Sequence, residues 1–268
     1  MSLSMLSPHT QPFPDPFPEG ALLLVDKPLA WTSFDVVNKI RYYLKRRLKL
    51  KKLKVGHAGT LDPLATGLLV VCVGNYTKRI DEFQGMPKAY TGTITFGATT
   101  PSFDLEKAVD ATFPTEHLTE ELLQEARQQF VGDILQVPPI FSAVKVAGKR
   151  LYKNARTGEE VEVPQRSVHV ESFELGPLHQ VAAGRTEMVV AYDKGGAPIM
   201  LHPDYAAGLQ CDFEVACSKG TYIRSLANDL GQAVGSGAYL SALQRTQIGD
   251  FSVENAWEME DLLLWLTG

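Results

Sequence analysis

The chain has 268 residues, of which 44% are hydrophobic and 21% are charged, and its formal net charge is −5. These proportions exclude a disordered or fibrous protein, and they supply enough apolar side chains for one large domain or for one domain with a small appendage. No apolar run reaches the roughly 18 residues that a membrane-spanning helix requires, and no basic, apolar leader opens the sequence.

The N-terminal residues predict a tail, a strand and the start of a helix. Residues 1–19 are rich in proline and are expected to form a flexible tail. Residues 22–25 are a short apolar run that predicts a buried strand, and the Asp-Lys-Pro sequence at 26–28 predicts a turn. A helix is expected to begin near Thr32 or Ser33, because either hydroxyl can cap it.

The predicted helix carries an apolar stripe and a dense run of positive charge. The stripe consists of Val36, Ile40, Leu44 and Leu48, which recur at every fourth position. Between positions 39 and 54 there are nine basic residues and no acidic one: Lys39, Arg41, Lys45, Arg46, Arg47, Lys49, Lys51, Lys52 and Lys54. These nine positive charges, set against a net charge of −5, leave −14 for the rest of the chain. Such segregation predicts a surface for a polyanion, with a solvated helix face as the alternative.

Residues 56–67 read GHAGTLDPLATG and are the most informative stretch of the chain. Their glycines, small residues and proline predict an unusually long loop, followed by a strand over 68–73. The loop holds one carboxylate, Asp62, and its glycines allow the backbone to approach a ligand closely. From the residues alone, an aspartate before a proline is more often a turn residue than a catalytic group.

The remaining elements mix strands and helices without a regular βαβ order. The predicted strands cover 90–96, 168–175 and 211–217. The predicted helices cover about 119–131, 221–234 and 258–266, and residues 176–210 are expected to form a Gly- and Pro-rich excursion. The order predicts an α+β fold with a mixed or antiparallel central sheet and flanking helices.

The three cysteines, Cys72, Cys211 and Cys217, are odd in number and form no CxxC pair. This usage predicts reduced thiols in the cytoplasm rather than disulfides or a metal site. Nothing in the sequence demands more than a monomer.

The stretch 56–67 closely resembles the aspartate motif of the TruB family, the bacterial tRNA pseudouridine-55 synthases. Further stretches agree with the same family in the same order; they cover 26–33, 88–90, 137–152, 218–226 and 243–249. The resemblance therefore covers nearly the whole chain. It implies the pseudouridine-synthase fold with an active-site cleft, and an enzyme without metal or cofactor that isomerises a uridine in the T-arm of tRNA.

The resemblance also implies roles for individual residues. Asp62 is expected to be the catalytic carboxylate, which either attacks C1′ of the ribose or takes a C2′ proton. Arg224 is expected to keep Asp62 ionised, and Tyr90 to stack on the uracil and help remove the C5 proton. His57 is expected to contact the nucleotides that flip out, and Lys27 to support the active-site loop.

Three of these side chains also have a plainer interpretation. Arg224 could be a phosphate contact or a surface ion pair, Tyr90 a core residue of a strand, and His57 a solvated loop residue. The RNA backbone and exposed bases are expected to meet a further basic and aromatic group. This group comprises Lys145, Lys149, Arg150 and Tyr152, together with Lys45, Arg46 and Arg47.

The sequence departs from the family near its C-terminus. Family members commonly continue into a small PUA domain, whereas this chain stops at Gly268. We therefore expect residues 20–250 to form the catalytic domain and 251–268 to form a short helical extension without a PUA domain. The basic run at 39–54 is expected to compensate in tRNA binding.

Three other interpretations stay open. The chain could be an RNA-binding protein or tRNA-folding chaperone, a synthase for another uridine or one guided by partner proteins, or an α+β protein with a chance basic helix. The combination of Asp62, Tyr90 and Arg224 argues against a chaperone that has lost catalysis. The variant Asp62→Asn separates the first alternative from the enzyme, because only modification should depend on the carboxylate.

Overall fold

The computed structural model describes residues 5–6, 8, 20–142, 145–146, 149–150, 163–181, 186–192 and 196–267, with the backbone alone at 145–146 and 149–150. The chain divides into two compact units. The first comprises Met1–Tyr90, Val190–Ile199 and Leu243–Gly268, and the second comprises Thr91–Val189 and Met200–Ala242. No helix in the described part of the chain is both long enough and apolar enough to cross a membrane.

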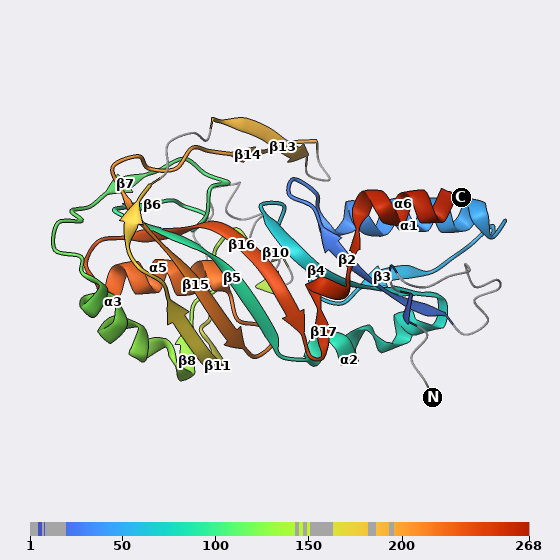
Figure 1. Ribbon diagram of the computed structural model, residues 1–268, viewed down its shortest axis with the longest axis horizontal. Helices are drawn as coiled ribbons and strands as arrows, with labels where there is room; N and C mark the ends of the chain where they lie inside the picture. Colours follow the sequence, from blue (N-terminus) through green and yellow to red (C-terminus); the bar gives the residue numbers. More distant parts are fainter. Residues whose placement is uncertain are drawn as a thin grey trace. The chain divides into compact units, whose positions relative to one another are not determined.

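The first unit is built on two long antiparallel strands. These are β2 (Ala21–Lys27) and β4 (Ala65–Val73), which pair along the whole of β2. Shorter strands add to them: β1 (Met5–Leu6), β3 (Val55–His57), β17 (Phe251–Ser252), β18 (Trp257–Glu258) and the end of β16 (Ala238–Ile248). The pairs of β1 and β18 with β2, and of β16 with β4, are parallel. The sheet is therefore mixed, and the predicted α+β class with a mixed sheet is confirmed (Figure 1).

Both faces of this pair of strands are buried, which explains why their sequences are continuous apolar runs. Leu23, Val25 and Leu69 point into one cluster, whereas Leu22 and Leu68 point into the other. The second cluster is closed by η1 (Gly74–Arg79), α2 (Ile80–Gly85) and η3 (Val253–Asn255).

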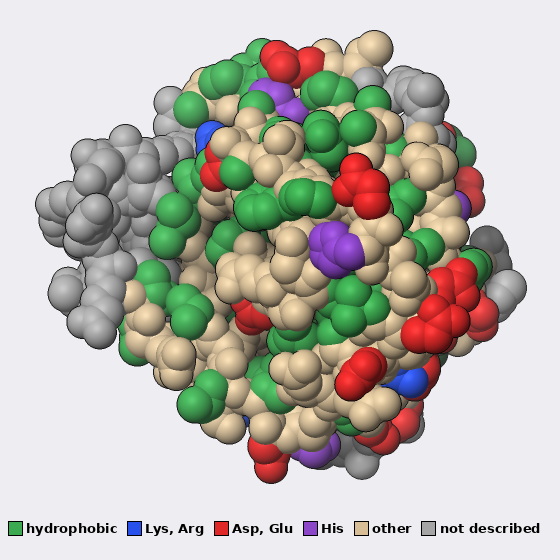
Figure 2. Space-filling model, turned by 90° about the vertical axis from the view of Figure 1, so that its left-hand side faces the viewer, with side chains coloured by type: hydrophobic (Ala, Val, Ile, Leu, Met, Phe, Trp, Pro, Cys, Tyr) green, Lys and Arg blue, Asp and Glu red, His purple; other side chains and the backbone are tan. Residues whose placement is uncertain are grey.

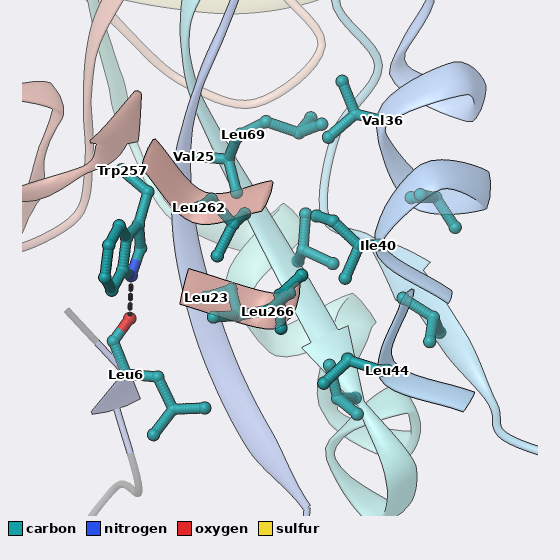
Figure 3. Packing of buried hydrophobic residues seen from close by; sticks show 14 of the residues in the cluster. Leu6, Leu23, Val25, Val36, Ile40, Leu44, Leu69, Trp257, Leu262 and Leu266 are labelled. Atoms are coloured by element: carbon teal, nitrogen blue, oxygen red, sulfur yellow. Dashed lines mark hydrogen bonds between the residues drawn. The ribbon is translucent and has the colours of Figure 1, made fainter. Parts of the chain in front are cut away.

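Helix α1 (Ser33–Arg47) covers the first cluster. Val36, Ile40 and Leu44 are fully buried, as their spacing predicts. They pack with Leu262 and Leu266 of α6 (Met259–Thr267), and the indole of Trp257 donates a hydrogen bond to the carbonyl of Leu6 at 3.0 Å (Figure 3). Each such buried side chain contributes about 1.5–3 kcal/mol, so the C-terminal helix is part of the core under α1.

The second unit contains an antiparallel sheet in which β8 (Gly132–Gln136) and β15 (Leu209–Cys217) flank β11 (Arg166–Leu175). Helices α3 (Glu120–Arg127), η2 (Gln128–Phe130) and α5 (Ile223–Ala233) belong to the same unit. The small strands are β6 (Ala98–Thr99), β7 (Ala111–Thr112), β9 (Lys145–Val146), β10 (Lys149–Arg150) and β12 (His179–Gln180). Strands β5 (Lys88–Phe96), β13 (Met188–Tyr192), β14 (Pro198–Leu201) and β16 pass from one unit to the other along the chain.

Some predicted boundaries were wrong. In the helix expected over about 119–131, the α-helix ends at Arg127 and is followed by the 3-10 helix η2 up to Phe130, after which Gly132, with a φ of 90°, opens β8. The loop expected over 56–67 is shorter, because β3 ends at His57 and β4 begins at Ala65. Met5 and Leu6, which lie in the predicted tail, pair with β2.

Candidate active site

Asp62 lies in the seven-residue connection between β3 and β4, within the first unit. Its side chain is partly exposed, and its carbonyl accepts a hydrogen bond from the Ala65 amide at 3.1 Å. This turn leads directly into the buried strand β4. A carboxylate on such a short, anchored connection has a defined position relative to the sheet.

The residues on both sides of Asp62 are tied to the segment that precedes and opens α1. The Ser33 hydroxyl accepts from the Leu61 amide at 2.9 Å and donates to the Leu61 carbonyl at 3.1 Å. The Ala30 amide donates to the Pro63 carbonyl at 3.0 Å. The backbone of Asp62 is thus held at its two neighbours.

Arg245, a residue of β16 that is only 2% exposed, links the start of the connection to strand β4. Its Nε donates to the Leu68 carbonyl at 2.8 Å and its Nη2 to the Gly59 carbonyl at 3.1 Å. Gly67 adopts a φ of 100°, and a Cβ there would lie 2.3 Å from the Arg245 carbonyl oxygen. Asp26 accepts a hydrogen bond from the Gly67 amide at 3.0 Å. Only glycine fits at this crossing.

Lys27 lies at the end of β2 and is fully buried. Its ammonium donates to the carbonyls of Pro28 at 2.9 Å and Trp31 at 2.6 Å, so it holds the turn whose Ala30 amide binds Pro63. Burial lowers the pKa of Lys27 to about 8, and the carboxylate of Asp62 opposes that shift. Lys27 thus contacts the backbone of the turn that lies beside the Asp62 connection.

His57 is the last residue of β3 and precedes the connection. Its Nδ1 is buried and has no hydrogen-bond partner among the described residues. Burial lowers the pKa of His57 below its ordinary value, so the imidazole is neutral near pH 7. A neutral, partly exposed imidazole is suited to a base or ribose rather than to a phosphate.

Tyr90 lies on β5 and belongs to the first unit, as Asp62 does. The side chain is partly exposed, whereas Ile94 and Phe96 further along the strand are buried. Tyr90 is therefore not the core residue that strand alternation alone would make it.

Arg224 lies in the first turn of α5, within the second unit, and it is buried. Its Nη1 lies 3.2 Å from Oδ2 of Asp104 and also donates to the Ser102 carbonyl at 3.0 Å, while Nη2 donates to the Phe141 carbonyl at 3.0 Å. A surface ion pair is thereby excluded. The guanidinium has a fixed orientation.

The last turn of α1 carries Lys45, Arg46 and Arg47. Arg46 lies over the ring of Tyr42, 5.5 Å from its centroid, and donates to the Tyr42 hydroxyl at 2.7 Å. Tyr42 itself is 52% exposed. Arg47 donates to the carbonyl of Trp265 in α6, so part of its function is structural.

Acidic rather than basic side chains are prominent on the face that Figure 2 shows. That face is poorly suited to RNA, in contrast to the basic helix α1. Of the second predicted basic group, Lys145, Lys149 and Arg150 lie on the antiparallel pair of β9 and β10, but their side chains fall outside the described residues, as does Tyr152. Within the described ranges, no group of three or more His, Cys, Asp or Glu residues is placed to hold a metal ion.

Sequence reasoning missed Ser33, Arg245 and Asp104 as site residues. Ser33 was considered only as a helix cap, a role that Thr32 fills. Arg245 lies in the stretch 243–249 that resembles a family motif, but its acceptors are backbone carbonyls, which no side-chain pattern reveals. Asp104 lies in no sequence motif that pointed to a functional role.

Two family models match the chain. The model "TruB family pseudouridylate synthase (N terminal domain)" matches residues 45–196, and "tRNA pseudouridylate synthase B C-terminal domain" matches 224–267. Proteins named tRNA pseudouridine synthase B are similar over almost their full length. The protein of Phocaeicola vulgatus is 49% identical over 255 residues, covering 93% of this chain and 94% of its own. That of Flavobacterium johnsoniae is 50% identical over 244 residues, covering 91% and 94%.

A solved structure shares the fold. In the crystal structure of a Cbf5-Nop10-Gar1 complex, one chain matches with a TM-score of 0.60 and 25% identity, covering 96% of this chain. This chain spans 57% of the length of that larger one.

Proposed function

Because this chain belongs to the TruB family of pseudouridylate synthases, which makes it an isomerase, we propose that it converts the T-arm uridine at position 55 of tRNA to pseudouridine with Asp62 as the catalytic carboxylate. The substrate is inferred from the names of the relatives. The observation that carries the assignment of Asp62 is its short connection, whose backbone is tied by hydrogen bonds at Gly59, Leu61 and Pro63.

The proposed reaction conserves every atom of the nucleotide. The N1–C1′ bond breaks, the uracil turns, C5 bonds to C1′, and the C5 proton leaves while N1 gains a proton. Asp62 acts on the ribose, either by attacking C1′ or by taking a C2′ proton. Neither route requires an oxidant, a metal or a cofactor.

Asp62 acts as an anion in either route, and nearby positive charge stabilises such an anion once bound RNA excludes water from it. We assign this role to Arg224, supported by its resemblance to the family's arginine. The ion pair with Asp104 fixes the orientation of the Arg224 guanidinium. Lys27 adds a second charge that interacts with Asp62.

Tyr90 and His57 are assigned to the base. The partly exposed ring of Tyr90 can stack on the uracil and assist removal of the C5 proton. The partly exposed, neutral imidazole of His57 is assigned to contact the flipped nucleotide.

The tRNA backbone is proposed to bind the last turn of α1, chiefly through Lys45 and Arg46, with Arg47 beside them. The predicted group of Lys145, Lys149, Arg150 and Tyr152 is proposed to bind it as well. We further propose a catalytic domain over 20–250 with an active-site cleft, a helical extension over 251–268, and a cytoplasmic monomer.

The test is to map pseudouridine in an unmodified tRNA transcript after incubation with the enzyme. We expect modification at the T-loop uridine, and none in a matched transcript that carries cytidine there. Modification at a different uridine would overturn the assigned position. No modification despite tight binding would favour the RNA chaperone instead.

A further inference from the structure

We infer that Ser33 is a positioning residue for Asp62, which it orients by holding both polar groups of the preceding residue, Leu61. The inference rests on the proposed function, because it concerns the geometry of the same carboxylate. It assigns a role to a hydroxyl that lies in the first turn of α1, 28 positions from its partner.

The contact is double and buried. Oγ of Ser33 accepts from the Leu61 amide at 2.9 Å and donates to the Leu61 carbonyl at 3.1 Å. Ser33 is 2% exposed and Leu61 is 4% exposed. Water therefore has little access to replace the hydroxyl, and its removal would leave a buried donor and a buried acceptor unpaired.

The helix does not need Ser33 for its own start. Thr32 is the N-cap: its hydroxyl accepts from the Asp35 amide at 3.1 Å, and the Asp35 carboxylate accepts from the Thr32 amide at 2.9 Å. These reciprocal bonds form a complete capping box. The Ser33 hydroxyl is therefore available for a partner outside the helix, and that partner is the Asp62 connection.

Position matters because Leu61 adjoins the reacting group. The Pro63 carbonyl is fixed by the Ala30 amide on the other side of Asp62. If the Ser33 bonds are removed, the connection keeps that tether and the Arg245 bond to Gly59, but the backbone next to Asp62 loses its hydrogen bonds at the Leu61 amide and carbonyl. A carboxylate displaced by a fraction of an ångström from C1′ or C2′ loses much of the benefit of proximity.

Two neighbouring hydroxyls give a matched experiment. We compare Ser33→Ala with Thr32→Ala, measuring tRNA affinity, the single-turnover rate of pseudouridine formation and the melting temperature. Thr32→Ala removes the N-cap hydrogen bond of the same helix but keeps the Ser33 hydroxyl that binds the Leu61 backbone. We expect Ser33→Ala to lower the single-turnover rate about 10- to 100-fold with tRNA affinity changed less than about twofold. Thr32→Ala should lower the melting temperature but change the rate less than about threefold.

Two further variants complete the test. Ser33→Thr keeps the hydroxyl and should recover most of the rate, whereas Ser33→Cys keeps the size with a poor donor and should not. If Ser33→Ala does not fold, the rates of Ser33→Thr and Ser33→Cys are compared instead, and a faster rate in Ser33→Thr supports the positioning role.

An unchanged rate in Ser33→Ala, or an equal loss in Thr32→Ala, would overturn the positioning role. So would a loss of tRNA affinity with the bound rate intact. The wild-type enzyme is assayed first. If it forms no pseudouridine, the proposed function fails, whereas an active wild type with an unaffected Ser33→Ala variant refutes the positioning role alone.

Discussion

Arg224 and Asp104 form a buried ion pair in the second unit, with Nη1 and Oδ2 3.2 Å apart and side chains only 5% and 7% exposed. The Asp104 carboxylate also accepts a hydrogen bond from the Glu106 amide at 2.9 Å. The pair therefore fixes the cation that we assign to Asp62. Its burial makes it sensitive to the removal of either partner.

The first prediction concerns this pair. Asp104→Ala leaves the Arg224 charge buried without its carboxylate, and we expect it to lower the free energy of unfolding by about 3–5 kcal/mol. Urea unfolding measures the loss. The matched control is Glu174→Ala, which breaks the exposed Arg127–Glu174 pair and should cost less than about 1 kcal/mol. If Asp104→Ala and Glu174→Ala lower the free energy of unfolding equally, burial does not make the Arg224–Asp104 pair more important for stability.

The second prediction is a pH dependence from Lys27. Its folded-state pKa is about 8, below the ordinary 10.5, so the unfolded chain binds this proton more tightly. The cost of burying the charge is fully present below pH 8 and is relieved as the pH rises towards 10.5. Relative to Lys27→Met, the wild type should therefore gain stability across this window, by up to about 1.4 kcal/mol per pH unit.

The same experiment in an Asp62→Asn background reports the interaction between the two charges. The carboxylate of Asp62 raises the pKa of Lys27. Removal of this charge in Asp62→Asn should therefore lower the pH at which the wild-type lysine begins to gain stability over Lys27→Met. A stability difference between wild type and Lys27→Met that is flat from pH 7 to 10.5 would contradict the prediction.

The third prediction concerns the crossing of Gly67 and Arg245. Gly67→Ala puts a Cβ 2.3 Å from the Arg245 carbonyl oxygen at a φ of 100°, so the backbone must shift near the start of β4, which follows the Asp62 connection. We expect a loss of stability and of pseudouridine formation together. Gly85→Ala is the control, because nothing lies within 4 Å of its Cβ, and its melting temperature should stay the same or rise slightly.

The fourth prediction concerns the basic helix. Charge reversal at Lys45 and Arg46 should weaken tRNA binding and reduce the slope of log affinity against log salt by about 1 for each phosphate that is no longer bound. Arg47 is left in place because it binds the Trp265 carbonyl. Reversal of Lys78, an exposed residue of η1 outside the run, is the control. If the double variant leaves the slope of log affinity against log salt unchanged, Lys45 and Arg46 of α1 do not bind tRNA phosphates.

Much of the fold could be predicted because the local patterns agree with the tertiary structure. The apolar runs of β2 and β4 and the four-residue spacing in α1 directly reflect burial. Strand β16 was missed because its apolar and polar residues do not alternate regularly. It forms a strand through parallel pairing with β4, which is far away in the sequence. Strand β8 was missed because it begins with glycine and aspartate, which seldom favour a strand, and it forms through pairing with β11.

The candidate site was predictable only in part, for a related reason. Asp62 and Arg224 stand in recognisable stretches, whereas the groups that hold them act on the backbone or over long separations. Arg245 binds a carbonyl 186 positions away, and Ser33 binds backbone groups rather than a side chain. Such contacts leave no pattern of residue types that a single sequence can reveal.

The central claim is that Asp62 catalyses the isomerisation. The most direct measurement is tritium release from C5-tritiated uridine in an unmodified tRNA transcript, with wild type beside Asp62→Asn at matched RNA occupancy. Asparagine keeps the shape of the side chain but cannot act as a nucleophile or a base, so we predict release by the wild type alone. Release by Asp62→Asn at the wild-type rate would contradict the catalytic role of the carboxylate.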